Sequence, residues 1–277
     1  MKEAILLTDC GSETIPAIAG LEEYYNADAD KELIAATIPD AEHSVMCAGG
    51  KEDELETFRR LITEIYPTGF VSIVSDTWDF WKVMTEYLPK LKDEILARDG
   101  RLVIRPGSTA VWVGAYEVLW GIFGGTINEK GYKVLNPKVG IIYGDSITLE
   151  RQKEIYKRLE ERGFAATNLV LGVGSYTYQY KSRDSLGFAM KATWCQVNGE
   201  GREIFKDPKT DDGTKKSLKG LICVQSDGDR YIAEDQVTKE QEDKSCLQTV
   251  FEDGKLVKEW SLRQIRDNVN NSIVLED

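Results

Sequence analysis

Four short apolar runs most constrain what this chain can fold into. Each consists mainly of Val, Ile and Leu and stops abruptly at polar, charged or glycine residues; the runs are VSIVSD (71–76), RLVIRPG (101–107), VGIIYGDS (139–146) and NLVLGVGS (168–175). They are too short for buried helices, so they predict parallel strands that are covered on both faces. Because the carboxyl ends of parallel strands meet on one rim, we expect the residues after the runs to lie together.

The segments between these runs have the periodicity of amphipathic helices. Residues 52–66 place five apolar side chains on one face, namely Leu55, Phe58, Leu61, Ile62 and Ile65. That spacing is typical of a helix that packs against a sheet. An alternation of strand, helix and strand with right-handed crossovers predicts an α/β fold with a parallel sheet or barrel.

Two further helices are expected from the same periodicity. Residues 78–100 have a helical pattern that Pro89 should divide and Gly100 should end. Residues 147–163 form the next helical pattern, with Gly163 as its expected end.

The character of the chain changes after about residue 190. Short β-type runs follow, separated by the turn sequences NGEG, SDGDR and EDGK, and a helical pattern lies near SLRQIRDN. Such turns between short strands predict antiparallel hairpins. We therefore expect an α/β barrel portion over residues 1–190 and a smaller β-rich region over residues 191–277.

Composition excludes some classes of protein. The 277 residues carry a formal net charge of -12, and an acidic surface repels nucleic-acid backbones. No apolar run is long enough to span a bilayer, and the N-terminus lacks the apolar core of a signal peptide, so we expect a cytoplasmic protein without membrane contact. The five cysteines form no C-x-x-C pair and are interpreted as reduced structural thiols.

Polar residues and glycines at the strand ends are candidates for ligand binding. They are Asp76, Arg105, Asp145, Gly172 and Gly174. A guanidinium binds a carboxylate, amide or phosphate, and carboxylates suit ribose hydroxyls or Mg2+. Glycines let backbone N–H groups approach a phosphate, which Arg183 and Lys191 would neutralise. Taken singly, each of these residues is equally compatible with a cap, a turn or the protein surface.

His43 is the only histidine of the chain. A lone histidine is commonly structural or simply exposed. However, Glu42 beside it and Asp76 on a strand end are carboxylates that would orient an imidazole or raise its basicity. A nucleophilic or acid–base role therefore stands beside the structural interpretation.

Long segments of the chain resemble nicotinamide phosphoribosyltransferases of the bacterial and phage type. They are AEHSVMCAGGKEDELETFRRLI, VSIVSDTWDFWKV, LVIRP, GGTINEKGYKVLNPKVGIIYGDSITLE, LGVGSYTYQYKSRDSLGFAMKATW and EIFKDPKTDDGTKKSLKG. The resemblance implies a partial TIM-like α/β barrel with a β-rich C-terminal region. It also implies transfer of the phosphoribosyl group of 5-phosphoribosyl 1-pyrophosphate to nicotinamide in NAD biosynthesis, with Mg2+ and with ATP as a coupled substrate.

The resemblance assigns roles to the residues near the histidine and the ribose. His43, preceded by Glu42, matches the histidine that is phosphorylated when ATP is consumed, and Asp76 resembles the carboxylate near it. Arg105 matches the arginine that contacts nicotinamide and ribose. Gly144 and Asp145, in YGDS, resemble the residues that hold the ribose hydroxyls.

Other positions match the phosphate and nicotinamide contacts of the family. Gly174 and Ser175 fall in the glycine-rich loop for the 5′-phosphate. Arg183 and Lys191 resemble basic residues that meet pyrophosphate or ATP phosphates, often across a dimer interface. Glu13 stands where the family has an aspartate that reads the carboxamide of nicotinamide.

Two departures from the family pattern predict impaired turnover by the isolated chain. Gly107 stands where the family has a carboxylate next to the ribose, and the chain corresponds to the second half of the family's sequence. We therefore expect a homodimer or a complementing N-terminal polypeptide. Two alternatives stay open. One is a nicotinate phosphoribosyltransferase, which Glu13 disfavours because its charge would repel the carboxylate of nicotinate. The other is a non-catalytic ligand-binding remnant.

Overall fold

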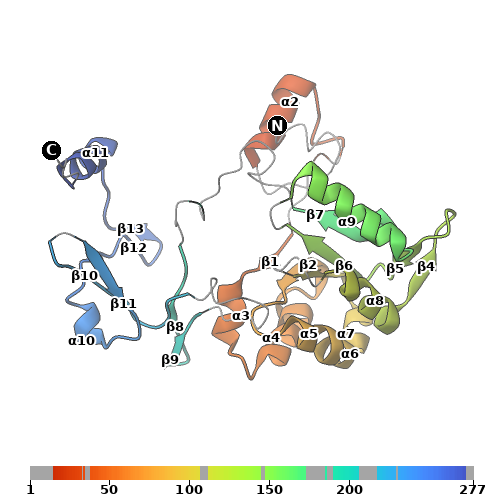
Figure 1. Cartoon of the computed structure of the whole chain (residues 1–277), viewed down its shortest axis with the longest axis horizontal. Coiled ribbons are helices and arrows are strands. Elements are labelled where there is room, and N and C mark those ends of the chain that lie inside the picture. Colours follow the sequence, from red (N-terminus) through yellow and green to blue (C-terminus); the bar gives the residue numbers. More distant parts are fainter. Residues whose placement is uncertain are drawn as a thin grey trace. The chain divides into compact units, whose positions relative to one another are not determined.

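The computed structural model describes residues 15–32, 34, 38–106, 112–144, 147–172, 185, 190–205, 217–228 and 230–272. The chain divides into two compact units, Met1–Ser217 and Leu218–Asp277 (Figure 1). The boundary expected near residue 190 came from a change in sequence character, and it stays a prediction.

A five-stranded parallel sheet forms the centre of the first unit. Its strands, in spatial order, are β1 (Asp40–Ala41), β2 (Thr68–Val74), β3 (Asp99–Arg105), β6 (Val139–Tyr143) and β7 (Leu169–Leu171). All four strands predicted from the apolar runs are therefore confirmed as neighbours in one sheet. Each new strand is added on the same side of the previous one, which is the order of consecutive strands in an α/β barrel. Among the described strands β1 and β7 are edges, so closure of a barrel is not seen.

Helices connect the strands and cover the core. They are α2 (Ile15–Tyr25), α3 (His43–Gly49), α4 (Glu54–Arg60), α5 (Phe80–Lys82), α6 (Leu88–Lys90), α7 (Lys92–Ala97), α8 (Trp112–Phe123), α9 (Leu149–Glu161), the π-helical turns η1 (Leu61–Ile65) and η2 (Val83–Tyr87), and the 3-10 turn η3 (Ala166–Asn168). Apolar side chains of the sheet and helices form one buried cluster, which includes Ile73, Ile104, Ile141, Phe58, Met84, Leu119 and Leu159. The predicted mode of burial, with helices packed on a parallel sheet, is confirmed.

Two details of the helix predictions are wrong. Ile65 was expected on the buried face but is 46% exposed, because the chain switches from α4 to the π-helical turn η1 and this wider turn rotates the residue away from the core. Gly100 does not end a helix. The last helix before it, α7, ends at Ala97, and Gly100 lies within β3, where an added Cβ would meet the carbonyl oxygen of Gly69 at 1.9 Å.

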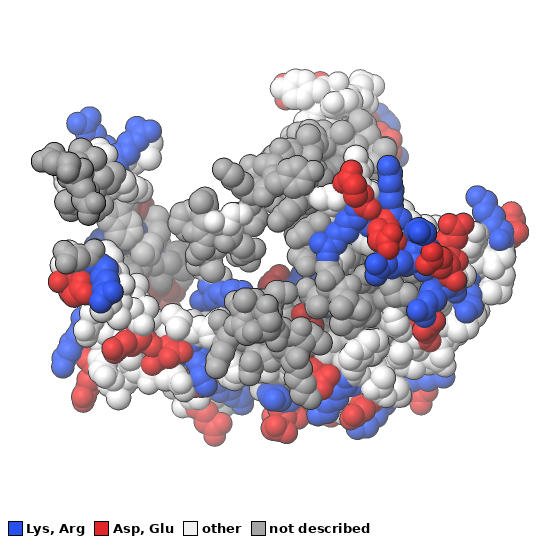
Figure 2. All heavy atoms as spheres, viewed as in Figure 1, with Lys and Arg blue, Asp and Glu red and all other residues white. Residues whose placement is uncertain are grey.

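The helix expected over residues 147–163 is α9. The side chain of its N-cap Thr148 accepts a hydrogen bond from the backbone N–H of Arg151, and Gly163 follows its end with a φ of 73°. Figure 2 shows red and blue side chains interleaved over this helix, which carries the i,i+4 ion pairs Arg158–Glu154 and Lys157–Glu161. The charged face of α9 is therefore a solvated surface.

Two antiparallel hairpins complete the described part of the first unit. One joins β4 (Gly125–Ile127) to β5 (Lys133–Leu135), and the other joins β8 (Trp194–Val197) to β9 (Glu200–Glu203). The second turns at Asn198 and Gly199, which both have positive φ and so form the turn predicted from NGEG.

The β8–β9 hairpin and the residues that follow it are anchored to α3. Arg202 Nη1 donates a hydrogen bond to the carbonyl oxygen of Ala48 (2.7 Å), and the thiol of Cys47 donates to the carbonyl oxygen of Phe205 (2.7 Å). The Phe205 ring also meets the Trp78 ring edge to face, with centroids 5.3 Å apart. These contacts explain why the hairpin packs with the first unit.

The second unit contains short elements only. They are β10 (Cys223–Ser226), β11 (Tyr231–Glu234), α10 (Lys239–Glu242), β12 (Phe251–Glu252), β13 (Lys255–Leu256) and α11 (Leu262–Ser272). The antiparallel pairs β10–β11 and β12–β13 and the helix α11 confirm the predicted hairpins and the helix near SLRQIRDN. None of the helices in the described ranges has the length and apolarity to cross a bilayer.

Candidate active site

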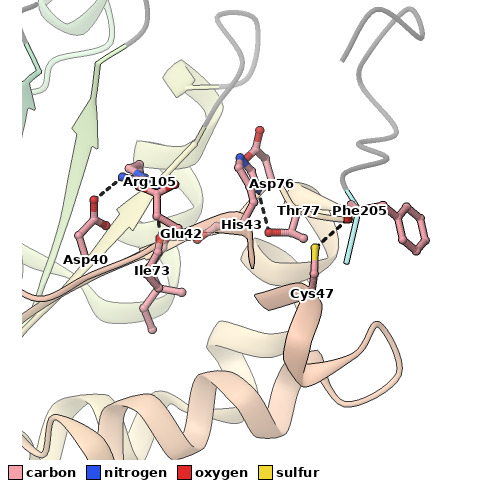
Figure 3. A network of polar contacts seen from close by, with 11 residues as sticks. Asp40, Glu42, His43, Cys47, Ile73, Asp76, Thr77, Arg105 and Phe205 are labelled. Carbon is pink, nitrogen blue, oxygen red and sulfur yellow. Dashed lines mark hydrogen bonds and ion pairs between the residues drawn. The ribbon is translucent and has the colours of Figure 1, made fainter. Parts of the chain in front are cut away.

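Three strand ends meet at the carboxyl rim of the sheet, the edge where β1, β2 and β3 terminate. β1 pairs with β2 through Ala41 and Ile73, and β2 pairs with β3 through Val74 and Arg105. Beyond the last pair, the backbone N–H of Ser75 donates to the carbonyl oxygen of Arg105 (3.0 Å). This register brings residues at or just after the end of each strand into one polar network (Figure 3).

The imidazole of His43 has a polar neighbour at each ring nitrogen. His43 is the first residue of α3, one residue beyond the end of β1, and 20% of its side chain is exposed. Its Nδ1 lies 3.1 Å from the Oγ1 of Thr77, and its Nε2 lies 3.6 Å from the Oδ1 of the buried Asp76. The sequence prediction that Asp76 lies beside His43 is thus matched by the geometry.

Arg105 lies next to the histidine but binds the end of β1. Its guanidinium forms an ion pair with Asp40, lies 3.2 Å from the Oε1 of Glu42, and donates to the carbonyl oxygen of Ala41 (3.1 Å). The arginine therefore fixes the segment that leads into His43. Its expected contact with nicotinamide and ribose stays a prediction.

Sequence reasoning missed Asp40 and Thr77. Both belong to this network, because Asp40 pairs with Arg105 and Thr77 contacts His43. A two-residue strand such as β1 has no periodicity that a sequence pattern reveals. For Thr77, the available signal was its position directly after Asp76 at a strand end.

A recess of about 330 Å³ opens beside His43. It is lined by Glu42, His43, Ser44, Cys47, Met190, Lys191, Ala192, Ile204, Phe205 and Ser217. Lys191 and His43 thus share one cavity although 147 positions separate them in the sequence. An ammonium group in the same recess as an imidazole favours an anionic ligand there.

Gly144 and Gly172 bring two further strand ends into contact. The backbone N–H of Gly172 donates to the carbonyl oxygen of Tyr143 (2.8 Å), and a Cβ added at Gly172 would lie 2.9 Å from the Cα of Gly144. The ends of β6 and β7 at Gly144 and Gly172 therefore lie side by side, at a spacing that only glycine permits.

The remaining predicted site residues lie outside the described residues. They are Glu13, Asp145, Gly174, Ser175 and Arg183, and Gly107 lies outside as well. Within the part of the chain that the structure describes, no three His, Cys, Asp or Glu side chains group as metal ligands.

Comparison with known proteins identifies the family. A sequence profile of the nicotinate phosphoribosyltransferase (NAPRTase) family matches residues 1–255. The chain belongs to this family. The family resemblance found in the sequence segments is thereby confirmed.

Three curated relatives are named nicotinamide phosphoribosyltransferase. The one from Acinetobacter baylyi is 50% identical over 94% of this chain and 55% of its own length. The one from Mycoplasma pneumoniae is 42% identical over 74% of the chain and 49% of its own length. The one from Xanthomonas campestris pv. campestris is 32% identical over 95% of the chain and 57% of its own length. The chain thus spans about half the length of the relatives it matches.

Proposed function

We propose that the chain serves phosphoribosyl transfer from 5-phosphoribosyl 1-pyrophosphate to nicotinamide, which yields nicotinamide mononucleotide and pyrophosphate for NAD biosynthesis. The observation that carries this proposal is the 50% identity to the Acinetobacter baylyi nicotinamide phosphoribosyltransferase over 94% of the chain. The family profile is named for nicotinate, so the acid is the competing substrate to test.

The carboxyl rim supports binding of an extended phosphorylated sugar. From β1 to β6 the rim spans three inter-strand spacings of about 4.8 Å, or about 14 Å in all. In the proposal Gly144 and Asp145 hold the ribose hydroxyls, and the adjoining LGVGS segment, with Gly174 and Ser175, takes the 5′-phosphate. The contact of Gly144 with Gly172 supports this arrangement, because these two glycines directly precede Asp145 and residues 173–175 in the sequence.

The nicotinamide end of the site would use Arg105 and Glu13. Arg105 is held at the rim by its ion pairs with Asp40 and Glu42, which leaves it next to the His43 recess. Glu13 would accept a hydrogen bond from the carboxamide of nicotinamide and would repel the carboxylate of nicotinate.

His43 is proposed as the acceptor of a phosphoryl group from ATP. Lys191 lines the same recess, so its positive charge would stabilise the phosphates there. Arg183 and Lys191 would likewise stabilise the departing pyrophosphate. Asp76, close to the Nε2 of His43, orients the ring and favours a proton on that nitrogen.

Mg2+ is part of the same proposal. The network contains two carboxylates, Asp76 next to His43 and Glu42 paired with Arg105, and Mg2+ is commonly held by one or two carboxylates together with substrate phosphates. When bound, the ion would neutralise charge on the diphosphate. The residues present thus fit an ion that arrives with its phosphorylated substrate.

The sheet would belong to a larger assembly. We propose that β1 to β7 are part of an α/β barrel, since their consecutive parallel order is that of such a barrel. The relatives are about twice as long as the matched region, so a homodimer or a complementing N-terminal polypeptide would supply the rest of the site.

Product formation tests the proposal directly. The chain is incubated with 5-phosphoribosyl 1-pyrophosphate, Mg2+ and either nicotinamide or nicotinate, with and without ATP, and the products are read by mass spectrometry. The part of the Acinetobacter relative outside the match is supplied in trans in a parallel series. We expect nicotinamide mononucleotide, in low yield from the chain alone, and an increase with ATP.

The variant His43→Ala separates the coupling role from the fold. It should abolish only the ATP-dependent increase and lower the free energy of unfolding by about 1–3 kcal/mol, because it leaves the buried Thr77 hydroxyl without its partner. Nicotinate mononucleotide as the main product would favour the nicotinate enzyme. Substrate binding without turnover in every series would favour the ligand-binding remnant.

A further inference from the structure

Thr77 has its side chain fully buried against the only histidine of the chain. The residue has 0% exposure, and its Oγ1 lies 3.1 Å from the Nδ1 of His43. In the described part of the chain this is the hydroxyl's only hydrogen bond. Thr77 follows Asp76 directly, so the end of β2 presents a carboxylate and a hydroxyl to the same ring.

The direction of this hydrogen bond follows from burial. A hydroxyl can donate or accept, but if it only accepted from the imidazole, its own proton would be buried without a partner, which is costly. The hydroxyl therefore donates, and the Nδ1 of the neutral ring carries the lone pair. The ring proton then lies on Nε2, which faces the carboxylate of Asp76. Both neighbours thus select the same tautomer.

We propose that Thr77 is a positioning residue that holds His43 by Nδ1 and keeps the neutral imidazole in the Nε2–H tautomer. This inference rests on the proposed function and deepens it, because the Nε2–H tautomer leaves Nδ1 as the nitrogen that would accept the phosphoryl group, and Nδ1 has to leave the Thr77 hydroxyl for that step. The charged groups around the ring are Asp76, Glu42 and Lys191, with Arg105 paired to Glu42. They influence how readily the ring takes up a proton, but none of them replaces the hydrogen bond at Nδ1.

The single histidine makes the test unambiguous. The full 277-residue chain is labelled with 15N in its histidine, and the two ring-nitrogen resonances are recorded at about pH 8.5, where imidazole is neutral. We expect the Nε2–H tautomer, with the resonance of Nδ1 displaced toward that of a hydrogen-bonded nitrogen. In Thr77→Val, which keeps the volume and removes the hydroxyl, that displacement should vanish. In Thr77→Ser it should remain.

The spectrum decides the inference even if the chain alone makes no product, so its failure and that of the proposed function are distinguishable. An Nδ1–H tautomer in the wild-type chain, or an Nδ1 resonance identical in the wild type and Thr77→Val, would overturn it. If Thr77→Val does not fold, the tautomer of the wild type and the behaviour of Thr77→Ser still decide.

Discussion

Glu54 is a buried carboxyl group whose ionisation the structure opposes. It is the first residue of α4, the helix that packs against the His43 helix α3, and it is 1% exposed. Its Oε1 accepts no hydrogen bond from the described residues. Burial raises the pKa of Glu54 from 4.5 to about 7. The negative charge of Asp79 adds to this rise, whereas the positive charges of Lys82 and Lys51 oppose it.

The raised pKa predicts a loss of stability with increasing pH. The folded protein holds the Glu54 proton more tightly than the unfolded chain, so this contribution to stability is fully present below about pH 4.5 and is lost as the pH rises through about 7. The difference between the two pKa values corresponds to at most about 3 kcal/mol. Relaxation and solvent screening reduce the effect, and we expect about 2 kcal/mol.

The variant Glu54→Gln removes the titration and keeps the shape. We compare the difference in free energy of unfolding between Glu54→Gln and the wild type at pH 5 and at pH 8. This difference should shift by about 2 kcal/mol in favour of the variant at pH 8. Any constant cost of the amide cancels, because it is the same at both pH values. Urea unfolding followed by tryptophan fluorescence measures these free energies. In a Trp260→Phe background the other five tryptophans all lie in the first unit, so the signal reports that unit.

A nearby exposed carboxylate supplies the control. Glu52 lies two residues earlier and is exposed, so Glu52→Gln makes the same chemical change outside the core and is measured alongside Glu54→Gln. A stability difference between Glu54→Gln and the wild type that is flat from pH 5 to pH 8 would refute the reasoning, because a carboxyl with a raised pKa must titrate in that window.

Two further predictions concern the frame of the site. Arg98 is 5% exposed and donates hydrogen bonds to the carbonyl oxygens of Ile62, Tyr66 and Gly69, so Arg98→Met should lower the free energy of unfolding in urea by about 3 kcal/mol, at about 1 kcal/mol per lost partner. The control Arg60→Met replaces an exposed arginine and should change the free energy of unfolding by less than about 0.5 kcal/mol. Equal effects of the two substitutions would contradict the role of Arg98. Gly172→Ala should push the ends of β6 and β7 apart and lower the free energy of unfolding by about 1–3 kcal/mol. It should also weaken substrate binding, which calorimetry measures. The matched control is Gly121→Ala, which lies in α8 with open space around it and should leave stability unchanged or raise it by up to about 1 kcal/mol. If Gly172→Ala also left stability unchanged, the two strand ends would not need to lie close together.

Much of the fold follows from local patterns. The runs of Val, Ile and Leu became β2, β3, β6 and β7 because a strand buried on both faces needs a nearly continuous apolar sequence. The helix α9 begins and ends near the residues expected for it, since its cap and its terminal glycine act through neighbouring backbone groups. The Asn198-Gly199 turn is equally local.

Long-range packing decided what these patterns could not show. The π-helical turns η1 and η2 change the face that their side chains present, and Gly100 is required by the close approach of Gly69 in the neighbouring strand rather than by a helix end. The short strand β1 exists only because β2 offers it a partner.

The sequence by itself determined the family, the apolar strands and the presence of one histidine with carboxylates at strand ends. Only the tertiary structure decided that Thr77 and Asp76 meet opposite nitrogens of His43, that Arg105 turns onto Asp40, and that Lys191 shares the His43 recess. The physical reason is that strand formation depends on residues close in the chain. A polar site depends on which strand ends the sheet register brings within hydrogen-bonding distance.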